Sequence, residues 1–142
     1  MTTATMTTEE MKAIVRRFID DIFLGKRLDA VDELVTDDFT PHTWGSTGSG
    51  KEALRTAIER VSQGLSETSM TIEDMIAEGD RVAVRLTSHA VQSGEFMGLP
   101  PSGKAYTIGE IHIFRITDGK VAEHWHQADF MGMMRQLGAP TG

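Results

Sequence analysis

The 142-residue chain contains no cysteine. This absence excludes a disulfide framework, a thiolate zinc site, an iron–sulfur cluster and a cysteine nucleophile. Apolar runs are only a few residues long, so we expect no membrane partner. The opening stretch, MTTATMTTEE, lacks the basic and then apolar segments of a secretory signal, which favours a cytoplasmic location.

Basic residues are fewer than acidic ones. The chain has 14 Lys and Arg against 21 Asp and Glu, which gives a net charge of −7. A protein that follows a phosphate backbone needs a basic face, so we expect no nucleic-acid partner. The 39% hydrophobic and 25% charged content are ordinary for a globular domain. The length predicts a single domain over residues 1–142, in which the polar residues 1–6 are expected to be disordered.

Helical periodicity dominates the first half of the chain. Thr7 and Glu10 have the spacing of a capping box, and apolar residues follow at intervals of three and four until Gly25. Two further helices are predicted, and the Thr-, Ser- and Gly-rich stretch between them is predicted to be a loop. These segments are the helices at 28–35 and 49–65 and the loop at 37–50.

The hydrophobic period changes to two in the second half, which predicts consecutive antiparallel strands and a short final helix. The predicted strands cover 70–77, 81–92, 104–116 and 120–129, and the helix covers 130–137. Helices followed by strands indicate an α+β protein. We expect a cone in which the N-terminal helices pack on a curved, mainly antiparallel sheet around an internal pocket, the default ligand site.

Alternation along the strands predicts which side chains face that pocket. The inward sets are Val82, Val84, Leu86, Ser88, Ala90 and Gln92; Tyr106, Ile108, Glu110, His112, Phe114 and Ile116; and Val121, Glu123, Trp125, Gln127 and Asp129. His124 and His126 have the opposite parity, so we expect them to face outward and to bind no metal. A one-residue bulge would reverse part of any set.

Several segments resemble one family. SGEFMGLPPSGKAY, IHIFRITDGKV and EHWHQADFMGMMRQLG, together with DDFTPH and SGKEALR, are similar to the SnoaL-like polyketide cyclases, also called ester cyclases, of the nuclear-transport-factor-2-like superfamily. The resemblance extends from about Thr8 to Gly138 and implies the cone fold. It also implies a cofactor-free intramolecular aldol closure of a small hydrophobic, carbonyl-bearing ligand, with polycyclic molecules among the candidates.

The resemblance further implies that Asp129 is the general base and that His42 and His112 are site histidines. Gln92 stands where many relatives have the histidine of Gly-Thr-His, and it can hydrogen-bond a substrate oxygen but cannot titrate. Large side chains are candidates for binding the substrate. The full set of substrate-binding candidates is Gln92, Trp125, Trp44, Tyr106, Phe114 and Phe18.

Each of these residues also has a structural interpretation. Asp129 can cap the final helix, His112 can be a hydrogen-bonded core residue, and His42 can lie in an exposed turn. The same scaffold serves isomerases, dehydratases, epoxide hydrolases and non-catalytic small-ligand-binding domains, so these functions remain alternatives. Apolar residues on the outer sheet face predict a homodimer or homotetramer; they are Val91, Ile111, Ile113 and Ala122.

Overall fold

The structure is a computed structural model that describes residues 6–42 and 50–139. Trp44, and Ser49 at the predicted start of the third helix, lie outside the described residues. The helices are α1 (Thr8–Phe18), the π-helical segment η1 (Ile19–Leu24), α2 (Ala30–Leu34), α3 (Gly50–Gly64) and α4 (Phe130–Gln136). The strands are β1 (Val35–Pro41), β2 (Leu65–Glu78), β3 (Arg81–Gln92), β4 (Ala105–Thr117) and β5 (Lys120–Ala128).

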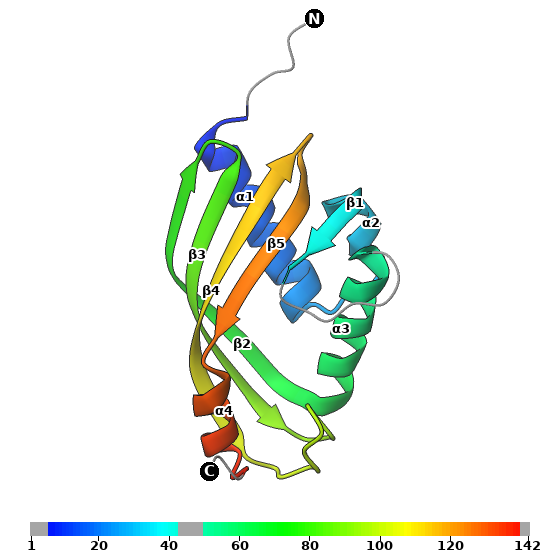
Figure 1. Ribbon diagram of the computed structural model, residues 1–142, viewed down its shortest axis with the longest axis vertical. Coiled ribbons are helices and arrows are strands. Elements are labelled where there is room, and N and C mark those ends of the chain that lie inside the picture. Colours follow the sequence, from blue (N-terminus) through cyan, green and yellow to red (C-terminus); the bar gives the residue numbers. More distant parts are fainter. Residues whose placement is uncertain (1–5, 43–49, 140–142) are drawn as a thin grey trace, which may run out of the picture.

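The five strands form one sheet in the order β1-β5-β4-β3-β2. Neighbours from β2 to β5 run antiparallel, whereas β1 runs parallel to β5. The sheet is curved and unclosed, with α1 lying across it and α3 beside it (Figure 1). This is the predicted α+β cone. Within the described residues, the helices lack the length and apolar character needed to cross a membrane.

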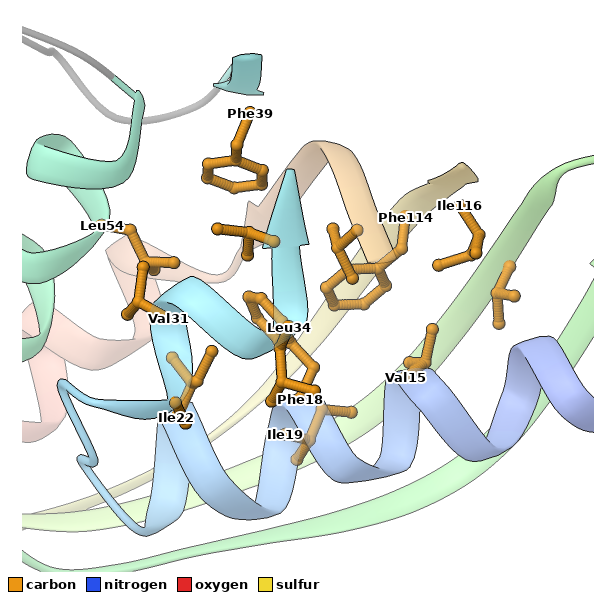
Figure 2. Close-up of a cluster of buried hydrophobic side chains, with 14 of the residues drawn as sticks. Val15, Phe18, Ile19, Ile22, Val31, Leu34, Phe39, Leu54, Phe114 and Ile116 are labelled. Carbon is orange, nitrogen blue, oxygen red and sulfur yellow. The ribbon is translucent and has the colours of Figure 1, made fainter. Parts of the chain in front are cut away.

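The first helix begins as the capping box predicts, because the Thr7 hydroxyl accepts a hydrogen bond from the Glu10 amide at 3.1 Å. One face of α1 then packs into the core with α2, α3 and the sheet (Figure 2). Met6, expected to be disordered, is partly buried against the same cluster. The buried side chains of α1 are Met11, Val15 and Phe18.

The helix continues into η1, whose wider turn is closed by the bond from the Gly25 amide to the Asp20 carbonyl. Periodicity alone predicts one uninterrupted α-helix to Gly25, since a single π-turn leaves the apolar spacing almost unchanged. Such turns are frequent at functional sites. Here the turn brings Ile22 and Phe23 to the wall of a cavity.

Strand β1 corrects the first part of the loop predicted over residues 37–50, because residues 37–41 are extended and paired, while residues 43–49 lie outside the described residues. Only Val35 and Phe39 are buried in β1, so the strand shows no alternation of period two. Its partner is β5, more than 80 residues away in sequence, and the pairing is parallel with an irregular register. Neither feature leaves a local pattern in the sequence.

Strand β5 contains a bulge that corrects the predicted inward set. Ile116 pairs with Val121, but the preceding Arg115 pairs with Glu123, so Ala122 is an extra residue. Val121 and Ala122 are therefore both buried, at 0% and 2% exposed. Beyond the bulge the parity is reversed: His124 and His126 face inward, while Glu123, Trp125 and Gln127 face outward. The inward sets of β3 and β4 are confirmed by their burial patterns.

Candidate functional site

A cavity of about 160 Å³ lies between the concave side of the sheet, η1, α3 and α4. Apolar side chains make up most of its wall, which suits a hydrophobic ligand. The principal apolar contacts come from Leu54, Ile58, Val61, Phe96, Phe130 and Met133. Polar side chains of β3, β4 and β5 form a cluster on the sheet wall, and Lys26, Thr68 and Ser69 line the cavity elsewhere.

The centre of this polar cluster is Glu110 on β4. Its Oε1 accepts hydrogen bonds from Nε2 of His112 at 2.8 Å and Nε2 of His126 at 3.1 Å. Its Oε2 accepts a bond from the Ser88 hydroxyl at 2.5 Å. His112 is joined in turn to His124 by a 2.8 Å contact between Nδ1 and Nε2. Four of these five side chains line the cavity, and His124 lies behind them.

The cluster keeps its carboxylate charged and its core histidines neutral. Burial alone would raise the pKa of Glu110, but hydrogen bonds from His112, His126 and Ser88 lower it below its ordinary value. Burial lowers the pKa of His112, partly offset by its bond to Glu110. Burial and the nearby Glu110 charge raise the pKa of Tyr106 to about 12, so its phenol stays protonated.

The same cluster could hold a metal ion by distance alone. Within the described residues, the potential ligand atoms of Glu110, His112 and His126 all lie within 4.8 Å of one another. However, the rings of His112 and His126 are stacked, with centroids 4.3 Å apart and planes 10° apart. An imidazole binds a metal through a lone pair in its ring plane. In this arrangement both Nε2 atoms are directed at Oε1 of Glu110, which can only accept, so they are engaged as hydrogen-bond donors.

The structure places His42 and Trp125 on the outer side of the sheet. Their rings are stacked at 4.7 Å, and His42 Nε2 contacts Glu123 Oε2 at 2.7 Å. The Arg81 guanidinium lies 4.9 Å from the centre of the Trp125 ring. This grouping is a consequence of the β5 bulge and is not part of the cavity wall.

Asp129 is the N-cap of α4, where its Oδ1 accepts a hydrogen bond from the Gly132 amide at 2.8 Å. The residue is exposed, and the cavity wall beside it is formed by Phe130 and Met133. The capping interpretation of Asp129 is therefore seen directly. The Asp129 carboxylate is not among the groups that line the cavity.

Gln92 faces inward, as its parity predicts, but it holds a loop instead of lining the cavity. Its Nε2 donates to the carbonyls of Leu99 and Pro100, both at 3.1 Å, and its Oε1 accepts from the Ser102 hydroxyl at 2.6 Å. These bonds tie down residues 93–103, the loop that carries Phe96 to the cavity wall. His89, which lies earlier on β3 than Gln92, does line the cavity.

Of the residues singled out in the sequence, the cavity thus brings together His112 and Tyr106. Phe18 and Phe114 are fully buried in the core. Sequence reasoning missed Glu110, Ser88 and His126 as site residues. For the first two a signal was present, because a carboxylate and a hydroxyl on an apolar inward face need a partner or a role.

The fold and this site define a class of protein: an α+β cone with a mainly apolar pocket and an acid–base cluster on its sheet wall. The chain matches the SnoaL-like polyketide cyclase family over residues 13–137, and it belongs to that family.

Individual relatives agree with this assignment. Aklanonic acid methyl ester cyclase AcmA of Streptomyces galilaeus is 32% identical over 133 residues, which cover 92% of each chain. Nogalonic acid methyl ester cyclase of Streptomyces nogalater is 32% identical over 117 residues, covering 80% of this chain and 87% of the relative. Among solved structures, TsrD from Streptomyces laurentii superimposes with a TM-score of 0.86 at 29% identity, covering 96% of this chain and 100% of TsrD.

Proposed function

We propose that the protein closes a ring in a polyketide methyl ester by an intramolecular aldol addition, without a cofactor. The observation that carries the proposal is a mainly apolar cavity in which one ionised carboxylate is held by two imidazoles. Relatives named for cyclising aklanonic and nogalonic acid methyl esters support the substrate class.

The reaction needs only proton transfer and positioning. A carbon between two carbonyls loses a proton, and the resulting enolate carbon forms a bond to a ketone carbon of the same molecule. The ketone oxygen then takes up a proton and becomes a hydroxyl. Atoms and electrons balance within the substrate, so the product is its isomer. The cavity contributes by holding the two reacting carbons close together.

We assign the proton transfer to the cluster of Glu110, His112 and His126. A histidine that accepts a proton becomes cationic, and the adjacent Glu110 carboxylate stabilises that charge. Tyr106 lines the same cavity with a protonated phenol, which can donate a hydrogen bond to the enolate oxygen.

Asp129 is a second candidate for the base. It follows β5 directly and adjoins Phe130, whose side chain lines the cavity. The resemblance in sequence also gives it this role. Against it stand its exposure and its bond to the helix terminus. Variants at Glu110 and Asp129 separate the two assignments.

The proposal is tested by incubating the purified protein with aklanonic acid methyl ester and analysing the mixture by liquid chromatography and mass spectrometry. We expect a new chromatographic species of unchanged mass. A product lighter by one water would indicate a dehydratase and overturn the assignment. Saturable binding of the ester without conversion would indicate a ligand-binding domain instead.

A further inference from the structure

His124 on β5 is a fully buried histidine whose presence packing alone does not explain. It is 0% exposed and surrounded by phenylalanine rings. The ring centroids of Phe114, Phe23 and Phe18 lie 4.7, 5.8 and 6.3 Å from its own. An imidazole in such a setting is costly unless it is hydrogen-bonded, and an apolar side chain would fill the same space more favourably.

The polar contact of His124 points toward the cavity cluster. Its Nε2 lies 2.8 Å from Nδ1 of His112, the next ring toward Glu110. A hydrogen bond between two ring nitrogens requires that one carries a proton and the other does not. The direction of this bond therefore decides the tautomer of His112.

The other side of His112 fixes that direction. Its Nε2 lies 2.8 Å from the Glu110 carboxylate, which can only accept, so His112 Nε2 carries a proton. A neutral imidazole has one N–H, which leaves His112 Nδ1 as an acceptor and makes His124 Nε2 the donor. Burial lowers the pKa of both histidines and so favours their neutral forms. The bonds run one way, from His124 to His112 to Glu110.

We propose that His124 is a positioning residue that fixes the tautomer and ring orientation of His112, so that the Nε2–H of His112 is directed at Glu110 in the cavity. The tautomer follows from these contacts together with the neutral forms of the two histidines. The catalytic consequence rests on the proposed function. His124 acts through His112 and does not itself contact substrate.

The first part of the test uses the wild-type protein with ¹⁵N-labelled histidine. Imidazole ¹⁵N shifts report which nitrogen of His112 is protonated, and a coupling across the N–H···N bond reports the contact with His124. We expect the proton of His112 on Nε2. A proton on Nδ1 of His112 would overturn the proposal, whether or not any substrate is turned over.

The second part compares three variants. His124→Leu removes the donor, His124→Gln keeps an amide N–H at similar reach, and Val121→Ala is a control that loosens the same strand without a polar change. We expect His124→Leu to give a mixture of His112 tautomers. It should also lower kcat by about 10- to 100-fold, the effect of losing a group that orients a functional histidine through its other ring nitrogen. KM should be little changed. His124→Gln should restore both properties.

The outcomes separate the two proposals. A kcat for His124→Leu no lower than that of Val121→Ala would overturn the positioning role. If His124→Leu does not fold, the wild-type spectrum and His124→Gln still decide, since a Gln variant with the wrong His112 tautomer contradicts the bond direction. Absence of turnover in every form, together with the expected wild-type tautomer, would count against the proposed function and not against the arrangement of His124 and His112.

Discussion

Glu110 and His126 are diagonal neighbours on β4 and β5, and Oε1 of one lies 3.1 Å from Nε2 of the other. The residue directly opposite His126 in the strand register is His112, which binds the same carboxylate oxygen. One oxygen therefore holds two imidazoles from facing strands. A change at Glu110 should disturb both rings at once.

Glu110→Gln is expected to lower kcat by about 10²–10⁴-fold, the usual contribution of positioned acid–base groups. The amide cannot replace a carboxylate that accepts three hydrogen bonds, and it carries no charge to stabilise an imidazolium. Asp129→Asn is the matched comparison, because asparagine caps a helix about as well as aspartate. Steady-state kinetics of both variants are the measurement. If Asp129→Asn loses turnover and Glu110→Gln does not, the base is Asp129.

Stability is expected to fall as the pH drops below about 6.5. The folded-state pKa values of His112 and His124 are depressed by burial, so the unfolded chain takes up protons at a pH where the folded chain does not. The stabilisation is complete above the unfolded pKa and is lost as pH falls toward the folded values. In that window, each group lowers the free energy of unfolding by up to about 1.4 kcal/mol for each pH unit of acidification.

Urea denaturation of wild type and His124→Gln between pH 7 and pH 5 checks this expectation. The variant should show a shallower decline, because one of the buried titrating groups is gone. His89→Gln, at a partly exposed histidine bonded to Thr107, is the control. If the free energy of unfolding fell equally steeply with pH in wild type and His124→Gln, the expectation would be wrong.

Gln92→Leu is expected to lower the free energy of unfolding by about 1–3 kcal/mol, the cost of leaving buried polar partners unsatisfied. It also releases the loop that carries Phe96, so ligand affinity should fall as a secondary effect. Ser93→Ala, at an exposed neighbour, is the control. The measurements are urea denaturation and ligand titration. Unchanged stability would mean that the loop does not depend on Gln92.

We expect the protein to associate through the outer face of the sheet, where Ile76 and Ile111 are 67% and 51% exposed. The double variant Ile76→Glu/Ile111→Glu should shift the assembly toward monomer, because burying unpaired charges is costly. Met131→Glu, at an exposed residue of α4, is the control. Light scattering at micromolar concentration is the measurement, and a monomeric wild-type protein would contradict the expected association.

Ala122 is not a suitable site for that test, although its parity in the sequence placed it on the outer face. It is only 2% exposed, so Ala122→Glu would bury a charge in the core and destabilise the monomer itself. Ile113, on the same outer face, lies between Ala83 and Trp125 in the register and is a suitable addition to the double variant.

The sequence predicted the regular parts of the fold well. β3 and β4 pair without interruption, so the alternation that places His112 and Tyr106 inward holds along their whole length. β5 departs from alternation at Ala122, whose small apolar side chain fits either face and gives no warning. Beyond it, every orientation inferred from parity was reversed, including those of Trp125 and His126.

The individual roles were less predictable for a different reason. Gln92 satisfies the loop carbonyls of Leu99 and Pro100, and Asp129 satisfies the Gly132 amide at a helix terminus. A polar residue at such a position is equally compatible with binding a ligand or binding the backbone. The choice depends on where the neighbouring loop folds back, and that is a tertiary property.

The bulge at Ala122 has a consequence for how β5 tolerates a change in length. Ile116 pairs with Val121 and Arg115 pairs with Glu123 on its two sides, so deleting Ala122 would join the two registers without changing either pair. His124 and His126 would still lie opposite the inward residues Phe114 and His112 and would still face the cavity. The imidazole pair is therefore insensitive to a one-codon deletion here, whereas a one-residue slip in the regular pairing beyond the bulge would turn the rest of β5 over.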